Sequence, residues 1–491
     1  MNRLWLCFVV VFPMIAGLMV PWFHRRFPGY LRIYLGLAVL FNSVLVWLLL
    51  FHRPETGITL FYFTGNLTIA FELDGLGSVF AGLVSFLWPL ATLYSFEYMT
   101  KEENEDIFFM FYTMTYGVTL GIALADNILT MYCFYELLTL VTVPLVMHTL
   151  TREAILASRK YLCYSIGGAA FSFIGMIFII VYGNTIDFVM GGVLDPGKIG
   201  DKGNVLLLVY VMAFLGFGVK AAICPFNSWL PQAGVAPTPV TALLHAVAVV
   251  KSGAFAAMRI TYYSFGTEFI RGSFAQYLLM ALVMFTIVYG CSMALKETHI
   301  KRRLAYSTIS NLSYILFGVV IMTPLGLGAA LTHMVCHAFM KICSFFCAGA
   351  IMHQTDRHYV HELDGLAKKM PATFAIFTVS AVALMGAPGL CGFISKWNLA
   401  AAAIDSGDML ARFGIGCLLV SALLTAMYML GIVVRAYFPG QDFDYDSIAD
   451  VRDPNWRMLL PLGSFVVIMF VLGLHSQPFV DLFMSVAQGR F

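Results

Sequence analysis

The sequence predicts an all-α polytopic membrane protein with about 14 transmembrane helices, two inverted five-helix repeats and two broken helices. Three observations support this fold class. Of the 491 residues, 60% are hydrophobic and 11% are charged, whereas soluble domains carry roughly 25% charged residues. Apolar runs of about 20 residues, long enough to cross a ~30 Å hydrocarbon core, recur along the chain. Two of these runs contain a proline beside a motif that occurs twice. A soluble globular fold is excluded.

Fourteen apolar segments separated by polar breaks are the predicted spans. They cover residues 4–22, 31–51, 76–97, 107–124, 127–150, 161–182, 204–230, 237–262, 276–296, 304–323, 327–352, 372–401, 411–437 and 458–474. The first segment has no small-x-small cleavage site before His24, so we expect a retained span and not a signal peptide. Residues 56–72 are rich in β-branched and aromatic residues around Thr64-Gly65-Asn66, which predicts a short hairpin outside the bilayer.

Lysine and arginine are distributed unevenly over the predicted loops. The loops that follow odd-numbered spans hold seventeen of the 29 basic residues, and the opposite side holds eight. Those eight are Arg3, Arg53, Lys198, Lys202, Arg259, Arg271, Arg412 and Arg490. By the positive-inside rule, the odd-numbered loops are cytoplasmic and both termini face outward. The net charge of +2 and the scattered basic residues exclude nucleic acid as a partner.

The remaining four lysines lie inside predicted spans, at positions 220, 251, 341 and 396. An ionisable group in such a span costs at least ~2.5 kcal/mol on insertion scales, so Lys220, Lys251, Lys341 and Lys396 are functional candidates. Among the acidic residues, Glu136 lies in the middle of the fifth span. One buried acid therefore accompanies four buried lysines.

Asp126 begins the helix that carries Glu136 and lies ten residues, or about 15 Å, upstream of Glu136. Two roles fit that position: the carboxylate stabilises the start of the helix, or it supplies protons to the buried residues from outside. We favour the stabilising role.

Two predicted spans are interrupted by proline, at Pro225 and at Pro388. A C-x-F-x-S motif at residues 224–228 recurs at 391–395, an offset of 167 residues. Because five is odd, a second copy of five helices enters the membrane from the opposite face, as in transporters with inverted repeats. Kinks at proline are common in membrane helices, so coincidence is the alternative.

The repeat divides the chain into four predicted regions. They are an N-terminal three-helix region (1–106), a first five-helix repeat (107–262), a second inverted repeat (276–437), and a C-terminal helix and tail (438–491).

Histidines accompany the buried lysines. His333, His337 and Lys341 recur at four-residue spacing, which places them along one side of a helix and fits a proton relay. Hydrogen bonding between helices is the alternative for each histidine. His245 precedes Lys251 by six residues, about 240° around a regular helix, so a π-bulge or a bridging water is needed to bring them together.

We expect the helix to distort after Lys251, at Ser252 and Gly253. The ten cysteines contain no C-x-x-C pair, and the chain has no Walker loop and no dinucleotide fingerprint, so we expect neither a metal site nor a cofactor in this chain.

Long motifs on consecutive spans carry a family resemblance. They are GVKAAICPFNSWLPQA, PTPVTALLHAVAVVKSGAF, KRRLAYSTISNLSY, HMVCHAFMKICSFF and GAPGLCGFISKWN, together with Glu136. Over residues 70–440 the sequence resembles the antiporter-like proton-translocating subunits shared by respiratory complex I (NADH-quinone oxidoreductase membrane arm), Mrp-type cation/proton antiporters and membrane-bound group 4 hydrogenases.

The resemblance implies residue roles. Glu136 and Lys220 resemble the family's glutamate and lysine pair, Lys251 resembles its central lysine with His245 on the same helix, and Lys396 resembles its terminal group. In the central-arm subunit of complex I the last position is typically glutamate, and the distal subunit has a long lateral helix that is absent here. The resemblance therefore points to Mrp-type, hydrogenase-type and quinone-proximal subunits.

A proton-transfer mechanism follows from burial. A lysine ammonium in a low dielectric loses its proton readily, and a nearby carboxylate favours the charged form. We therefore expect approach of Glu136 to hold Lys220 protonated, and its withdrawal to release the proton towards Lys251 through water. The alternative is a static ion pair that joins two helices.

The predicted function is proton translocation across the cytoplasmic (inner) membrane of a prokaryote, as the non-redox pumping subunit of a multi-subunit oxidoreductase. A subunit of an Mrp-type sodium/proton antiporter is the alternative, and an inactive scaffold ranks last because buried lysines are costly. The expected partners are paralogous antiporter-like membrane subunits, peripheral redox subunits and the lipid bilayer.

Overall fold

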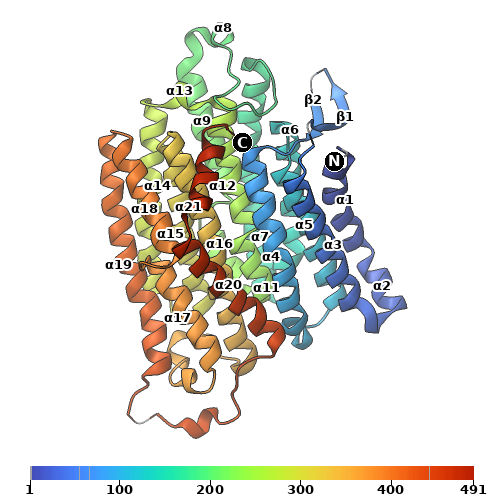
Figure 1. The fold of residues 1–491 in the computed structure, drawn as a ribbon, viewed down its shortest axis with the longest axis vertical. Helices are drawn as coiled ribbons and strands as arrows, with labels where there is room; N and C mark the ends of the chain where they lie inside the picture. Colours follow the sequence, from blue (N-terminus) through green and yellow to red (C-terminus); the bar gives the residue numbers. More distant parts are fainter. Residues whose placement is uncertain (1–2, 55, 66, 442, 491) are drawn as a thin grey trace.

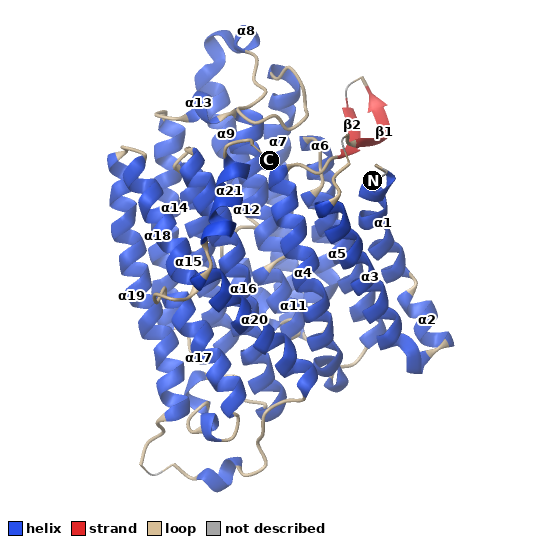
Figure 2. Ribbon diagram, viewed as in Figure 1, coloured by secondary structure: helices blue, strands red, loops and turns tan. Residues whose placement is uncertain are grey.

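Residues 3–54, 56–65, 67–441 and 443–490 are described by a computed structural model of the chain. Long helices run along a common direction and form one bundle, with a small two-stranded hairpin at one end (Figures 1 and 2). The prediction of an all-α polytopic membrane protein is confirmed. Both termini lie toward the end of the bundle that carries the hairpin and α8 (Figure 1).

The N-terminal part contains five long helical segments and the hairpin. Its elements are α1 (Leu4–Leu18), α2 (Val20–Arg26), η1 (Pro28–Tyr30), α3 (Leu31–Phe51), β1 (Ile58–Thr64), β2 (Leu67–Phe71), α4 (Gly75–Tyr98), η2 (Met99–Lys101), α5 (Glu105–Ala123) and α6 (Ile128–Val146). The strands pair antiparallel, with Ile58 opposite Phe71 and Thr64 opposite Leu67. The predicted hairpin is therefore confirmed, and its turn residue Asn66 lies outside the described residues.

The middle of the chain alternates long helices with short ones. Its elements are α7 (Arg152–Tyr182), α8 (Pro196–Ile199), η3 (Gly200–Lys202), α9 (Gly203–Gly218), α10 (Trp229–Gln232), η4 (Ala233–Val235), α11 (Thr238–Ala246), α12 (Val249–Arg259), the π-helix η5 (Ile260–Phe265) and α13 (Thr267–Ile270). The segment from α11 to η5 is entirely buried within the protein, so it occupies the centre of the bundle.

The C-terminal half surrounds a second central helix, α16. Its elements are α14 (Phe274–Lys296), α15 (Ile300–Val320), α16 (Pro324–Thr355), η6 (Val360–Glu362), η7 (Leu366–Lys368), α17 (Pro371–Met385), α18 (Cys391–Asp405), α19 (Met409–Tyr437), η8 (Tyr445–Ile448), α20 (Trp456–Leu474) and α21 (Gln477–Ala487). The most apolar stretch of α16 is 94% buried, whereas that of α19 is 33% buried. The centre of the protein therefore holds α16, and α19 faces the lipid.

Among the described residues, 11 helices are long and apolar enough to cross a membrane, or 12 if the bent pair of α1 and α2 forms one span. The two helices of that pair meet at 44°. The predicted count of fourteen also includes α15, which is rich in serine, threonine and tyrosine, and the α17–α18 segment, whose two helices have 15 residues each. The count of fourteen and the inverted repeat stay predictions.

The two predicted breaks are present. Helix α9 ends at Gly218, and the chain continues without a long helix to the four-residue α10. Helix α17 ends at Met385 with Gly386 in the left-handed conformation (φ 93°), and α18 begins at Cys391. Pro225 follows the end of α9 by seven residues and Pro388 follows the end of α17 by three, and neither residue can continue a helix, because proline lacks an N–H donor and its ring clashes with the preceding turn.

A third break separates α11 from α12, and the sequence prediction placed it wrongly. The expected distortion at Ser252 and Gly253 is absent, because both residues lie inside α12. The helix instead opens at Val247 and Ala248, where the Ala248 N–H donates to the carbonyl of Leu243, five residues back. This hydrogen bond is a π-type turn. A π-bulge between His245 and Lys251 is therefore present, upstream of its expected position.

Candidate functional site

Lys220 lies in the break after α9, where its buried side chain contacts α6. Its ammonium donates to the carbonyl of Tyr135 and lies 3.5 Å from the centre of the Tyr135 ring. The Tyr135 hydroxyl donates to the carbonyl of Phe217 at 2.8 Å, so Tyr135 joins α6 to the end of α9 twice. Sequence reasoning missed Tyr135, although it directly precedes Glu136.

Glu136 lies next to this contact without closing an ion pair. Among the ion pairs of the described residues, which extend to 4.0 Å, none joins Glu136 to Lys220. The Oε1 atom of Glu136 is buried and has no hydrogen-bond partner among the described residues. The static ion pair is therefore not formed in this conformation.

Gly253 brings α12 against the break at Lys220. A Cβ atom at Gly253 would lie 2.5 Å from the backbone N of Ala221 and 2.9 Å from the carbonyl carbon of Lys220. Contacts under 3.0 Å with backbone atoms cannot be relieved by a side-chain rotation. Only glycine therefore allows α12 to approach the backbone of Lys220 and Ala221 this closely.

Lys251 and His337 form the centre of the site. The Lys251 Nζ atom lies 2.5 Å from the His337 Nδ1 atom, and both side chains are fully buried. His245 lies across the α11–α12 break, where its ring packs against Phe345 with centroids 4.7 Å apart. Both ring nitrogens of His245 are buried without a hydrogen-bond partner among the described residues. Buried polar groups without partners are rare in folded proteins.

From His337, polar contacts continue to the α17–α18 break. The rings of His337 and His333 have centroids 5.7 Å apart, and His333 Nδ1 lies 3.0 Å from the hydroxyl of Ser395 on α18. The next residue is Lys396, which donates to the carbonyls of Leu384 at 2.7 Å and Met385 at 3.0 Å. Its ammonium therefore bonds carbonyls that the end of α17 leaves without helical partners.

Lys341 lies on the same helix as the histidines but points to different partners. It donates to the hydroxyl of Ser307 at 2.6 Å and to the carbonyl of Leu304 at 3.2 Å, both on α15. The hydroxyl of Tyr428 on α19 also donates to Ser307, at 2.6 Å. The predicted series on α16 thus has a close pair of histidines, and Lys341 forms a branch toward α15 and α19.

Asp126 lies between α5 and α6, and its expected role as the cap of α6 is wrong. The cap of α6 is Asn127, whose side chain accepts from the N–H of Thr130 at 2.8 Å. Backbone bonds instead join residues 124–126 to the end of β2 and to Phe188. These bonds bring the Asp126 carboxyl close to Glu72 and Asp187. Burial, the hydrogen bond to Glu72 and repulsion from both neighbours raise the pKa of Asp126 to about 7.

Asp126→Asn is expected to stabilise the protein at alkaline pH. Because the pKa of Asp126 is higher in the folded than in the unfolded protein, its destabilising effect grows as pH rises from about 4 to about 7 and is complete above 7. The variant should therefore melt at a higher temperature than the wild type at pH 8.5 and at nearly the same temperature at pH 4. Thermal unfolding in detergent at both values measures this. A pH-independent difference would contradict the assignment.

The sequence predictions did not include an ion pair near this end, in which Arg259 is buried and Asp74 is partly buried. Arg259, at the end of α12, donates with both terminal nitrogens to the two Asp74 oxygens, at 2.6 Å each. The rings of Phe188, Phe255 and Tyr263 lie about the guanidinium at 4.8–5.0 Å. The sequence analysis assigned Arg259 to an outer loop, whereas the structure buries it.

Comparisons with known proteins agree with this architecture. Residues 125–427 match the family described as NADH:quinone oxidoreductase/Mrp antiporter, TM. Residues 62–109 match the family described as NADH-Ubiquinone oxidoreductase (complex I), chain 5 N-terminus. NADH-quinone oxidoreductase subunit N of Desulforudis audaxviator is 31% identical over 430 residues, which cover 84% of this chain and 83% of that protein.

Two solved complexes contain a chain with the same fold. A chain of the membrane-bound sulfane sulfur reductase, an archaeal respiratory membrane complex, has a TM-score of 0.85 and 22% identity, covering 100% of this chain and 98% of that chain. A chain of the Mrp complex from a Dietzia species has a TM-score of 0.85 and 23% identity, covering 98% of this chain and 52% of that chain.

The fold and the buried residues together define a polytopic membrane subunit of the antiporter-like class. The match covers more than half of the chain. The protein belongs to the NADH:quinone oxidoreductase/Mrp antiporter family of membrane subunits.

Proposed function

We propose that this protein translocates protons across the cytoplasmic membrane of a prokaryote, as the non-redox subunit of a multi-subunit, redox-driven complex. The observation that carries the proposal is the buried series of exchangeable groups between the first and last helix breaks. In the described part of the chain it contains Lys220, Lys251, His337, His333 and Lys396, with Lys341 as a branch. Neutral side chains at these positions would cost less free energy to bury, because a charged side chain inside a membrane is strongly unfavourable.

The contacts support the following order of proton transfer. Withdrawal of Glu136 from Lys220 destabilises the ammonium and releases its proton toward Lys251. Gly253 brings the two backbones together, and a water next to the unpartnered nitrogens of His245 completes this step. From Lys251 the proton passes to His337 by direct contact, then through His333 and Ser395 to Lys396.

The proposal also includes an internal repeat of the helices. The five-helix segments 107–262 and 276–437 are inverted repeats, each with one proline-broken span. Inverted repeats place discontinuous helices at corresponding depths in opposite orientation, so that one faces each side of the membrane. With both termini outside, α8 and the hairpin lie on the outer face. Asp126 then gives outside protons access to the helix of Glu136.

We favour redox coupling over ion exchange on the support of one relative, which aligns over more than four fifths of both chains. The Desulforudis protein is named as a subunit of NADH-quinone oxidoreductase and aligns over four fifths of its own length. A redox-driven role implies paralogous antiporter-like subunits beside this chain and peripheral subunits that carry the electrons. The alternative is a subunit of an Mrp-type sodium/proton antiporter, since the matching family description names both assemblies.

Lys220→Ala in the native complex tests the proposal. We expect coupled proton movement in proteoliposomes to fall at least ~10-fold, while the complex still assembles, because the side chain that exchanges protons at the first break is gone. Lys202→Ala, at an exposed lysine, is the matched control and should transport normally. Unchanged proton movement in Lys220→Ala would contradict proton translocation by this series.

Gentle extraction with mass spectrometry tests the type of complex. Copurification of flavin or iron–sulfur subunits supports the redox-driven assembly. Copurification of small membrane subunits alone supports the sodium/proton antiporter.

A further inference from the structure

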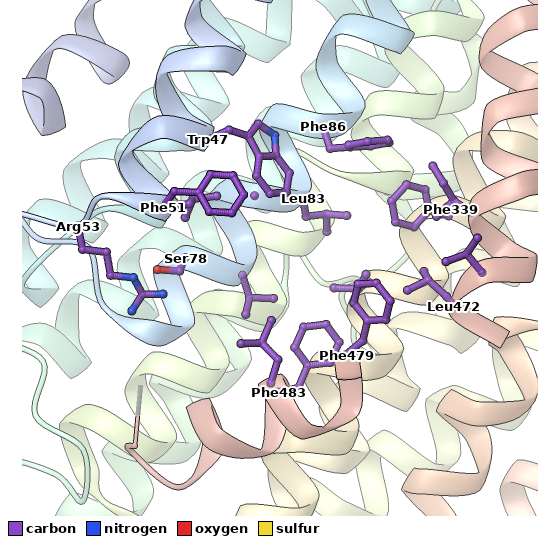
Figure 3. A pocket seen from close by; sticks show the side chains of 17 residues that line it. Trp47, Phe51, Arg53, Ser78, Leu83, Phe86, Phe339, Leu472, Phe479 and Phe483 are labelled. Carbon is purple, nitrogen blue, oxygen red and sulfur yellow. The ribbon is translucent and has the colours of Figure 1, made fainter. Parts of the chain in front are cut away.

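Two features of the structure are unused by the proton series. One is a groove of about 440 Å³ between α3, α4, α16, α20 and α21 (Figure 3). Its lining is apolar except for Arg53 and Ser78, and a guanidinium stays protonated in proteins, so this groove is a poor path for protons. The other feature is a group of ionisable side chains at the end of the bundle away from the hairpin, where the ends of α4 and α16 meet the starts of α11 and α15.

Lys301 is the buried member of this group. It lies in the first turn of α15 and is 4% exposed. Its ammonium carries three N–H donors but has one hydrogen-bond acceptor among the described residues, the carbonyl of Ala236 at 2.9 Å. A positive charge is unfavourable at the N-terminus of a helix, and burial adds to that cost. Stability alone therefore explains this lysine poorly.

Glu102 lies beside Lys301 and is partly exposed. Burial raises the pKa of the Glu102 carboxyl group, and the nearby ammonium of Lys301 opposes that shift. No ion pair within 4.0 Å joins the two among the described residues, so they interact with a gap between them. Both residues belong to loops that follow odd-numbered predicted spans, so the proposed orientation places them at the cytoplasmic face.

A line of polar contacts leads from Lys301 along α11 to the centre of the protein. The carbonyl of Ala236 that accepts from Lys301 also accepts from the hydroxyl of Thr241, at 3.0 Å. Thr241 precedes His245 by four residues, so their side chains lie one turn apart on the same side of α11. Both ring nitrogens of His245 lack a partner among the described residues, and the charges of three lysines, Lys301 among them, act on this ring.

We propose that Glu102 and Lys301 form the port through which the buried series exchanges protons with the cytoplasm. This inference rests on the proposed function. The ammonium of Lys301 gives a proton to a ring nitrogen of His245 through the Thr241 hydroxyl and water. The neutral amine that remains takes a proton from the carboxyl group of Glu102, and the resulting carboxylate takes one from cytoplasmic water. His245 then passes its proton to Lys251.

Chemical rescue of Lys301→Cys in the native complex tests the port. We expect coupled proton movement in proteoliposomes to fall at least ~10-fold in this variant. Treatment with 2-aminoethyl methanethiosulfonate adds an amine at about the position of the lysine ammonium and should raise the rate at least ~5-fold. The trimethylammonium analogue of the reagent adds a charge without an exchangeable proton and should not raise it. Lys296→Cys, at an exposed lysine of α14, is the matched control and should transport normally throughout.

The outcomes of this experiment are decisive in both directions. Equal recovery with the two reagents would mean that position 301 needs only a positive charge, and the port would be wrong. Failure of mass spectrometry to detect modification of the cysteine would mean that water does not reach this position, which would also overturn the port. Lys301→Arg needs no reagent: it keeps the charge and a donor for Ala236 but exchanges no proton, so we expect it to be inactive, and normal transport would contradict the proposal.

Glu102→Gln tests the cytoplasmic side of the port. It should slow proton movement by roughly threefold to tenfold, because the amide cannot hand a proton to Lys301. Glu103→Gln, at the exposed neighbouring residue, should have no effect. Lys220→Ala separates the two proposals. If it abolishes transport while the Lys301 variants transport normally, the port is wrong and the proposed function stands, whereas normal transport in Lys220→Ala contradicts the proposed function itself.

Discussion

Lys251→Met is expected to abolish proton translocation by the complex, with transport falling at least ~10-fold to the background of empty vesicles. Lys251 lies at the only position of the described series where an ammonium and an imidazole are in direct contact, with Nζ 2.5 Å from Nδ1 of His337. Methionine keeps the length and apolar packing of the side chain but cannot exchange a proton. The initial rate of proton uptake into proteoliposomes, driven by the complex's own reaction, measures the effect.

Two further variants define the role of Lys251. Lys296→Met removes an exposed lysine at the end of α14 and should leave the rate unchanged. Lys251→Arg keeps a positive charge, but a guanidinium stays protonated in proteins, so this variant should be as inactive as Lys251→Met. Normal transport in Lys251→Arg would show that the position needs charge alone, and the proton series would be wrong at its centre.

Asp74→Asn is expected to destabilise the protein by about 3 kcal/mol, the lower end of the range for removing one partner of a buried ion pair. Asparagine caps helices as well as aspartate does, so the bond from Gly77 N–H to the cap of α4 is preserved and the variant isolates the charge. The Arg259 side chain, 2% exposed, then has no bidentate partner. The surrounding aromatic rings and the nearby Asp126 keep the loss at the lower end.

Denaturant titration in mixed micelles measures this loss. Asp201→Asn, at an exposed aspartate, is the control and should change the midpoint little. The double variant Asp74→Asn, Arg259→Met should regain part of the stability, because it removes the uncompensated charge. A midpoint for Asp74→Asn equal to that of the wild type would contradict a stabilising ion pair at this site.

Hydropathy and proline placement predict much of this fold. A segment that crosses the hydrocarbon core of a bilayer must be long and apolar. Most helices could therefore be recognised from the sequence. The breaks near Pro225 and Pro388 follow from the chemistry of proline. The position of the break between α11 and α12 could not be predicted, because Val247 and Ala248 carry no local signal for it. Tertiary packing opens that helix.

Site residues whose burial in a membrane costs much free energy could be predicted from the sequence. Site residues whose burial costs little could not. Buried lysines are conspicuous in an apolar segment, so the four lysines could be singled out. Ser307, Ser395 and Tyr428 are ordinary residues of membrane helices, and only the folded chain reveals their contacts. Ser307 accepts from Lys341 and from Tyr428, and Ser395 lies within hydrogen-bond distance of His333. Asp74 and Arg259 were missed because they are 185 positions apart and each resembles a loop residue.

The C-terminal helices have a consequence for the biosynthesis of the protein. Helix α20 packs against α4, α16, α17 and α18, and α21 adds contacts to α4 and α16. Gly473 at the end of α20 lies against the backbone of Gly389 and Leu390, in the break before α18. Because a chain emerges from the ribosome N-terminus first, this surface of α4 stays uncovered until the last helices have been made. Premature release of the nascent chain would therefore leave an N-terminal helix exposed to the quality-control proteases of the membrane.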